Sequence, residues 1–299
     1  MSRLVELACQ VLPAEQLLGN RDWLDKQPFP VISFGGETPN ADVVVSSYEQ
    51  AIKLVERINT NPIAALTLIQ VLRLSDRLSP LQALDVESMA YATLQGGAEF
   101  MRWREQLDSL PVKAEEVGPP IRLRRVGNEL YATLNRPTSR NSMTVEMRDA
   151  WVEMLSLLNH DSSITRLHLN ALGDCFSSGG ELCEFGSRPD TGAAHWIRTV
   201  QSPARLMAEH GHKTVVRVHG ACIGSGIELP AFSARIEAAS NTHFVLPELK
   251  MGLIPGAGGT VSIARRIGRQ RTALMVLSGR RVNSRTALEW GLIDAIVPQ

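Results

Sequence analysis

Three glycine-rich turns and two glutamates carry the clearest potential for chemistry in this sequence. The turns are Ser177–Gly180, Gly220–Gly226 and Gly252–Gly259, and the glutamates are Glu228 and Glu248. Glycine allows a backbone to approach a ligand closely, and a pair of carboxyl groups can divide general acid and general base work. These segments are therefore the first candidates for an active site.

None of the turns matches a nucleotide-binding or nucleophile motif. No Gly-Lys pair is followed by Ser or Thr, as a P-loop requires, and Gly256–Val261 lacks the last glycine of the Rossmann pattern. Ile223 stands where a nucleophile elbow around Ser225 would need glycine. His210 and His212 have no further ligand at metal spacing, so no metal site is expected.

The pattern around Ser225 favours a different kind of site, an oxyanion hole. A β run at Thr214–Val218 is followed by a glycine turn, and Pro230 is tolerable only if a helix starts near Ser225. The first N–H groups of a helix have no internal partner and carry the positive end of its dipole. Gly179–Gly180 offers a second exposed N–H. Two such groups converging on one carbonyl oxygen would stabilise a thioester enolate.

The two glutamates also have an ordinary interpretation. Glu228 stands in the first turn of the expected helix, where a carboxylate favours the dipole without any catalytic role. Glu248 follows a β run and could simply be a surface residue. Spacing alone leaves both interpretations open.

The elements that must position these residues lie in the second half of the chain. Short β runs alternate there with helical stretches, which predicts an α/β fold. The expected strands are Ile121–Val126, Leu130–Leu134, Arg166–Ala171, Thr214–Val218 and His243–Val245. The expected helices are Thr144–Asn159, His195–Glu209, Gly226–Ala234, Val261–Ile267 and Arg271–Ser278.

The first half is predicted to be helical from about Val45 to Leu110. Ile52, Val55 and Ile58 recur at helical spacing after Ser46-Ser47. Two further helices are expected, over Ala64–Leu74 and from Ser79-Pro80 onward, and Glu87 falls within the second.

The segments on either side of these helices are rich in turn-forming residues. Residues 1–40 contain many Pro and Gly and are expected to wrap irregularly with one short helix. Residues 111–120 combine charged residues with Pro119-Pro120 and are interpreted as a linker.

Composition excludes several classes of protein. The 299 residues include 31 basic and 31 acidic side chains, a balance that argues against a strongly basic nucleic-acid binder. No apolar stretch approaches the roughly 18 residues of a membrane span, and Met1–Leu12 lacks the features of a secretory signal. Cys9, Cys175, Cys183 and Cys222 form no C-x-x-C pair, which favours reduced thiols and a cytoplasmic enzyme.

Several motifs, in order, resemble the crotonase superfamily, also called the enoyl-CoA hydratase/isomerase family. They are Leu134–Pro137 with Asn141–Met143, Phe176–Leu182, Gly220–Leu229, Pro247–Thr260, Ser278–Arg281, Ala287 and Gly291–Asp294. The resemblance implies an α/β fold of the crotonase (ClpP-like) spiral type, built from ββα units, with an N-terminal helical region. The sequence departs from the family pattern where Ser225 replaces glycine, Glu181 replaces aspartate and Ser233-Ala234 replace Cys-Asp.

The resemblance also implies residue roles. The N–H groups of Gly180 and Ser225 would form the oxyanion hole, and Glu228 and Glu248 match the two glutamates that hydratases use. Ser178 and Gly179 would help to line the coenzyme A pocket. Coenzyme A would enter as part of the thioester substrate, with no permanently bound cofactor, and the assembly would be a homotrimer or a dimer of trimers.

The N-terminal helices resemble a segment that family members usually carry at the other end. Members normally continue after the Gly291–Asp294 segment with a helical tail, and Tyr48–Arg104 resembles that tail. The arrangement is therefore predicted to be a circular permutation, although a lineage-specific helical domain is an alternative. Three regions are expected: the extension and helices at 1–110, the linker at 111–120 and a crotonase-like catalytic core at 121–299.

The leading functional hypothesis is a hydratase of trans-2-enoyl-CoA. A double-bond isomerase that relies chiefly on Glu248 is the second hypothesis, and a non-catalytic scaffold that binds acyl-CoA is the third. A hydrolase using Cys183, Cys222 or Ser178 lacks a histidine at a recognisable position and is disfavoured.

Overall fold

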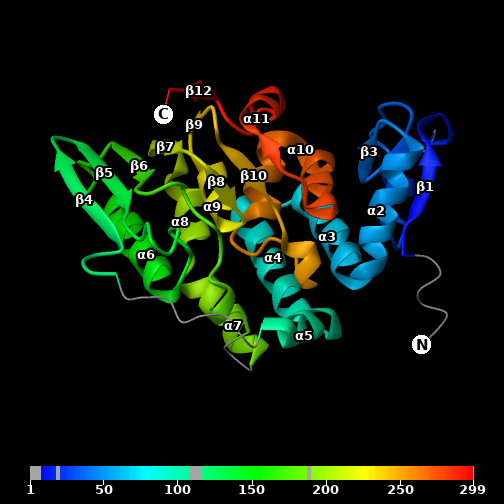
Figure 1. Cartoon of the computed structure of the whole chain (residues 1–299), viewed down its shortest axis with the longest axis horizontal. Coiled ribbons are helices and arrows are strands. Elements are labelled where there is room, and N and C mark those ends of the chain that lie inside the picture. The colour runs from blue at the N-terminus through cyan, green and yellow to red at the C-terminus, as the bar shows by residue number, and fades with distance from the viewer. Residues whose placement is uncertain (1–7, 18–20, 108–115, 187–189, 299) are drawn as a thin grey trace.

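A computed structural model describes residues 8–17, 21–107, 116–186 and 190–298. Its largest sheet has six strands in the order β12-β9-β7-β6-β5-β4, parallel except for the β4–β5 hairpin (Figure 1). The strands are β4 (Ile121–Val126), β5 (Glu129–Leu134), β6 (Arg166–Ala171), β7 (Thr214–Val218), β9 (Arg235–Ala239) and β12 (Ala295–Val297). The predicted α/β class is confirmed.

A second sheet has three strands. Its order is β11-β10-β8, formed by β8 (Ala221–Ile223), β10 (His243–Val245) and β11 (Val282–Asn283). From β7 to β10 the chain alternates between the two sheets, since β7 and β9 belong to the first and β8 and β10 to the second. Consecutive turns between β7 and β10 therefore deliver their residues to one place.

Helices cover the large sheet and complete its core. Trp151, Met154 and Leu158 of α6 (Val145–His160) are buried, and they belong to the same hydrophobic cluster as the alternating buried residues Leu130 and Ala132 of β5. The remaining helices of this half are α7 (Thr191–Val200), α8 (Pro203–His210), α9 (Ser225–Glu228), α10 (Gly259–Ser278) and α11 (Ser284–Trp290).

Four N-terminal helices pack onto the second half of the chain rather than apart from it. They are α2 (Tyr48–Thr60), α3 (Pro62–Ser75), α4 (Pro80–Gln95) and α5 (Ala98–Arg104). α3 lies along α10, and Leu68 and Leu72 share one hydrophobic cluster with Val276 (Figure 1). The Asn61 amide also donates to the Leu249 carbonyl at 2.8 Å. One continuous core thus joins the two halves of the chain.

The sequence predicts the start of these helices from their caps. The Ser47 hydroxyl accepts from Gln50 N–H at the start of α2, and Ser79 with Gln82 forms a capping box at the start of α4. Of the three apolar residues at helical spacing in α2, Ile58 is buried, whereas Ile52 and Val55 are only partly so; Ala51 and Leu54 complete the buried face.

Two predicted helices are shorter than expected because proline interrupts them. The helix expected over His195–Glu209 is two helices, α7 and α8, with a break before Pro203. The helix expected over Gly226–Ala234 ends as α9 at Glu228, and a 3₁₀ turn follows at Pro230–Phe232. The strand β9 (Arg235–Ala239) follows, and the sequence patterns did not predict it.

The first 45 residues are more regular than expected. Beside the short helix α1 (Arg21–Asp25), a parallel sheet contains β1 (Gln10–Pro13), β2 (Val31–Phe34) and β3 (Val43–Val45). This sheet was missed because its pairing is between strands far apart in sequence. It lies at the opposite end of the molecule from β4–β6 (Figure 1).

The linker predicted at 111–120 is only partly within the described residues. Residues 111–115 lie outside them, and Glu116 accepts from the N–H groups of Thr138 and Ser139. Among the described residues, no helix is both long and apolar enough to cross a membrane.

Candidate active site

Glu228 lies at the end of the one-turn helix α9, whose start depends on Gly224. Gly224 has φ +50°, a conformation that favours glycine. The Glu228 N–H donates to the Gly224 carbonyl at 2.9 Å. The side chain is 2% exposed, and its Oε2 accepts from Ala257 N–H at 2.8 Å and Gly259 N–H at 2.9 Å. The carboxyl is therefore buried and fixed by the backbone.

Glu248 begins a short 3₁₀ helix, Glu248–Met251, and points at the same glycine. A Cβ at Gly224 would lie 2.9 Å from Glu248 Oε1 and 3.7 Å from Glu228 Oε1. The two carboxyls predicted from sequence therefore flank one residue, although 20 positions separate them. Glu248 is 7% exposed rather than a surface residue, and its Oε2 has no hydrogen-bond partner among the described residues. A buried oxygen of this kind is unusual outside functional sites.

A third carboxyl, that of Glu87, reaches this site from α4. Its Oε1 accepts from Gly258 N–H at 2.7 Å, and its Oε2 accepts from the N–H and hydroxyl of Thr260 at 2.9 and 2.6 Å. Sequence analysis placed Glu87 in a helix without giving it a role in the site. The available signal was its position between Leu84 and Tyr91 on the apolar face of that helix.

Burial sets the protonation of all three carboxyls. It raises the pKa of Glu228 to about 7 and that of Glu87 to about 8, with the charge of Glu228 adding to the rise at Glu87. Burial likewise raises the pKa of Glu248 well above its usual value, and the charges of Glu228 and Glu87 add to the effect. Glu228 has two backbone donors that favour its ionised form, whereas Glu248 Oε2 has none, so of these two carboxyls Glu248 holds its proton more tightly.

The two backbone turns expected to form an oxyanion hole run side by side. Ser177 and Cys222 form a parallel bridge, and Ile223 N–H donates to the Ser177 carbonyl at 3.1 Å. Gly180 lies three residues after Ser177, and Ser225 lies three residues after Cys222. Within the described part of the chain, neither N–H donates to another backbone group, and the Ser225 hydroxyl is also unpartnered.

Ser178 and Gly179, the positions expected to bind coenzyme A, lie on the first of these turns. Ser178 is partly buried, and its N–H donates to the Arg140 carbonyl at 2.9 Å. Gly179 is buried with φ +86°, and a Cβ there would lie 2.6 Å from the Ile223 carbonyl oxygen. Gly179 therefore allows the two turns to approach each other, while only Ser178 has exposed surface.

A cavity of about 290 Å³ lies beside the carboxyls. Ala257, which donates to Glu228, and Leu229, which follows Glu228, both line it. Its wall is completed by α4, α7 and the segments 143–148, 181–186 and 201–204, including Tyr91, Arg198 and Phe185. The predicted residues Gly180, Ser225, Glu228 and Glu248 do not line it themselves, and the Phe185 ring is packed against Gly180.

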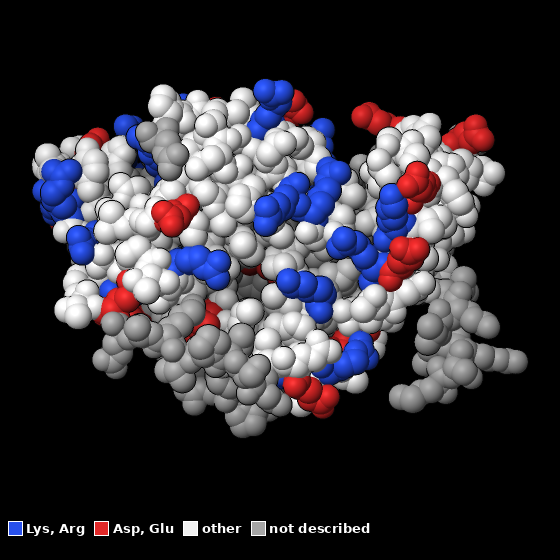
Figure 2. Space-filling view, viewed as in Figure 1, with Lys and Arg blue, Asp and Glu red and all other residues white. Residues whose placement is uncertain are grey.

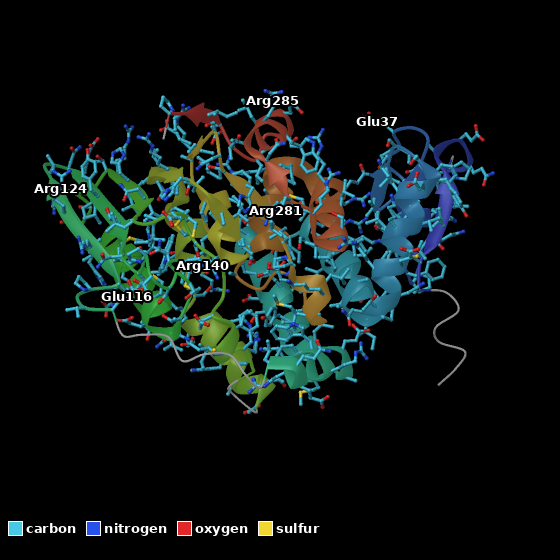
Figure 3. The ribbon with its side chains drawn as sticks, viewed as in Figure 1. Glu37, Glu116, Arg124, Arg140, Arg281 and Arg285 are labelled. Carbon is cyan, nitrogen blue, oxygen red and sulfur yellow. The ribbon has the colours of Figure 1, made fainter. Side chains whose placement is uncertain are left out.

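The face in Figure 2 shows a hollow near its centre, with acidic atoms inside and basic side chains around it. Arg140 is one of the basic residues beside this hollow, as the same view with side chains shows (Figure 3). The Arg140 carbonyl also accepts the Ser178 N–H, so this basic residue lies next to the turn that is expected to bind coenzyme A.

The two cysteines considered as nucleophiles do not gain support. Burial raises the pKa of the Cys222 thiol well above its usual value, which disfavours the reactive thiolate. Cys183 is exposed, and all four cysteines are free.

Comparisons with known proteins identify the family. The model of the enoyl-CoA hydratase/isomerase family matches residues 127–299. The chain is 32% identical over 169 residues to the 2,3-dehydroadipyl-CoA hydratase of Escherichia coli, covering 56% of this chain and 66% of that protein. It is also 32% identical over 171 residues to the 1,2-epoxyphenylacetyl-CoA isomerase of Escherichia coli, covering 55% and 64%. The chain thus spans slightly less than two thirds of these curated relatives.

Solved structures agree on the fold. An enoyl-CoA hydratase of Mycobacterium smegmatis has a TM-score of 0.56 and 25% identity, covering 60% of this chain and 71% of that one. The enoyl-CoA hydratase subunit of Geobacillus kaustophilus has a TM-score of 0.55 and 24% identity, covering 60% and 69%. Residues 1–126 lie outside the family match, and the circular permutation stays a prediction.

Proposed function

Because the chain belongs to the enoyl-CoA hydratase/isomerase family, we propose that it adds water across the 2,3 double bond of an enoyl-CoA thioester. The observation that carries this proposal is the pair of buried carboxyls on either side of Gly224. Hydration needs one group to take a proton from water and another to supply a proton to the α carbon. Two adjacent carboxyls in different environments meet both needs.

The proposed reaction begins with Glu228 as the base. Its carboxylate removes a proton from water while the water oxygen bonds to the β carbon of the substrate. The electrons of the double bond move toward the thioester, whose oxygen becomes an enolate. Support for this role comes from the two backbone donors that favour the ionised form of Glu228.

Stabilising the enolate is the proposed task of Gly180 and Ser225. Their N–H groups would donate to the thioester oxygen, more strongly as negative charge develops there. The parallel course of the two turns and the uncommitted N–H groups support this assignment. Glu248, as the carboxylic acid, then gives its proton to the α carbon and completes the hydration.

Coenzyme A would bind as part of the substrate, and the reaction requires no permanently bound cofactor and no metal. The basic rim near Arg140 suits the phosphates of coenzyme A, and Ser178 and Gly179 lie next to it (Figures 2 and 3). By analogy with the family, we further propose a cytoplasmic homotrimer or dimer of trimers that binds neither nucleic acid nor membrane. The balanced charge of the chain favours this assignment.

A second candidate is a double-bond isomerase that uses chiefly Glu248. Its support is the unpartnered Oε2 of Glu248, since the Oε2 of Glu228 is already occupied by the backbone. A single carboxyl can shuttle a proton between two carbons of an acyl chain. The third candidate, a scaffold that only binds acyl-CoA, requires neither carboxyl.

Glu228→Gln and Glu248→Gln, assayed separately, distinguish the candidates. Turnover is followed by the loss of the conjugated-thioester absorbance with short and medium trans-2-enoyl-CoA esters, and by isomer analysis with 3-enoyl-CoA. A hydratase loses about 10²–10⁴-fold in kcat with either substitution. Loss with Glu248→Gln alone would indicate an isomerase, and acyl-CoA binding without turnover in the parent protein would indicate a scaffold.

A further inference from the structure

Arg198 of α7 presents a buried guanidinium that the proposed mechanism does not use. The side chain lines the cavity and lies over the Tyr91 ring, 4.4 Å from its centroid. Its Nη1 donates to Gln95 Oε1 at 3.1 Å. Its Nε and Nη2 are buried and have no hydrogen-bond partner among the described residues. A charged group with two unmet donors away from water is costly unless a ligand satisfies it.

The two unpartnered nitrogens form one edge of the guanidinium, and this edge fits a carboxylate. Two other arginines of the chain use the same edge in that way. Arg73 donates through Nε and Nη2 to the two oxygens of Asp42, at 2.9 and 2.6 Å. Arg136 does so to the two oxygens of Glu146, at 3.2 and 2.7 Å. Such forked pairs are among the strongest hydrogen-bonded contacts in proteins.

The other charged groups around the cavity leave this edge without an anion. Arg148 is committed to Asp149, at 2.6 Å, and to Gln201. Of the acidic groups in the wall, Glu181 accepts from Ser142 and Glu184 accepts from the Val145 N–H, so both are held by other partners. Glu87 lies near enough to interact with the charge of Arg198, and both line a second cavity of about 10 Å³, but no ion pair or hydrogen bond joins the two side chains in the described structure.

We infer that the substrate's acyl chain ends in a carboxylate, which the Nε–Nη2 edge of Arg198 binds. The inference rests on the proposed function, because it names the class of acyl-CoA that the site takes. Leu229 and Ala257 connect the cavity to Glu228, so a chain extending from the reacting carbons would enter the space that Arg198 lines. A volume of about 290 Å³ is at the small end of ligand pockets and suits an acyl chain rather than the whole thioester.

Binding requires a modest rotation of the guanidinium toward the cavity, because the edge is covered from solvent in the structure. Rotation gives up the Nη1 hydrogen bond to Gln95 and the contact with the Tyr91 ring. Two charge-assisted bonds to a carboxylate outweigh that cost.

The test compares two saturated, unreactive thioesters of equal length, adipoyl-CoA and hexanoyl-CoA. Isothermal titration calorimetry measures their Kd values with the full-length protein. We expect adipoyl-CoA to bind at least about 10-fold more tightly, as a charge-assisted pair predicts. Arg198→Met should abolish the difference while leaving hexanoyl-CoA binding unchanged within about 3-fold, which also shows that the variant is folded.

Two further variants separate the forked contact from charge alone. Arg198→Lys keeps the charge but loses the planar fork, and it should retain only part of the preference. Arg148→Met removes another cavity arginine that is already paired, and it should keep the preference for adipoyl-CoA. Equal binding of the two thioesters by the parent protein, or a preference that survives Arg198→Met, would overturn the inference.

Turnover separates this inference from the proposed function. Hydration of trans-2-hexenoyl-CoA with no preference for a terminal carboxylate would overturn only the inference. Preferential binding of adipoyl-CoA without hydration of its 2,3-unsaturated counterpart would overturn only the hydratase proposal. Failure to bind either thioester would overturn both.

Discussion

Glu87 and Glu228 hold alternate N–H groups of a single loop. Glu228 accepts from residues 257 and 259, while Glu87 accepts from residues 258 and 260. These residues lead into α10, so both carboxyls also lie at the positive end of that helix. Because Glu87 comes from α4, the N-terminal helices supply part of the support for a catalytic candidate in the other half of the chain.

Glu87→Gln should lower activity and change its pH dependence. The amide keeps the size of the side chain, but its NH₂ group must face a backbone N–H, so the loop and Glu228 shift and kcat falls roughly 10–100-fold. The charge of Glu87 helps to raise the pKa of Glu248. Without that charge Glu248 loses its proton more readily, and the alkaline limb of the kcat/KM profile should move to lower pH. An unchanged profile would mean that Glu87 supports the loop without influencing the acid.

Substitutions at Ser225 test whether its backbone, rather than its hydroxyl, contributes to catalysis. Ser225→Gly and Ser225→Ala should retain most of the turnover, because the hydroxyl has no partner among the described residues and the N–H remains. Ser225→Pro removes the N–H at the first position of α9, where helices tolerate proline, and should lower kcat about 10²–10³-fold. If the Gly and Ala variants were inactive but folded, a serine nucleophile would become the better explanation.

Gly179→Ala should destabilise the protein more than the matched substitution Gly127→Ala. Both glycines have positive φ, at +86° and +59°, so both substitutions incur conformational strain of about 1 kcal/mol. A Cβ at Gly127 would meet nothing within 4 Å, whereas one at Gly179 would lie 2.6 Å from the Ile223 carbonyl oxygen. We expect a further loss of about 1–3 kcal/mol at Gly179, measured by urea unfolding. Equal losses would show that the two turns can separate freely.

Asp42→Ala should cost about 3–5 kcal/mol of unfolding free energy, because it leaves a buried arginine without its carboxylate. Asp42 is 1% exposed and pairs with Arg73, and it also accepts from Arg269 of α10 at 3.3 Å. The control is Glu49→Ala, which removes an exposed pair with Lys53 and should leave the unfolding free energy almost unchanged. Similar midpoints for the two variants in thermal unfolding would contradict a structural role for the N-terminal sheet.

Local sequence patterns were sufficient where an element depends on its own residues. The bounds predicted for β4, β6, β7 and β10 agree with the structure, since each is a short β-rich run between turn residues. The caps at Ser47 and Ser79 likewise lie within the segments that they terminate. Predictions failed where proline or partner strands intervened, as at Pro203 and in the sheet β1–β3.

The sequence by itself determined the two glutamates and the two turns, because their motifs are contiguous and each requires a particular residue type. That Glu228 and Glu248 flank Gly224 follows from the folded structure alone, since two strands of different sheets, β9 and β10, separate them along the chain. The folded structure also decided that Glu87 joins them and that Arg198 lines the cavity. Burial and the distance between charges depend on which helices pack together, and no local pattern encodes that packing.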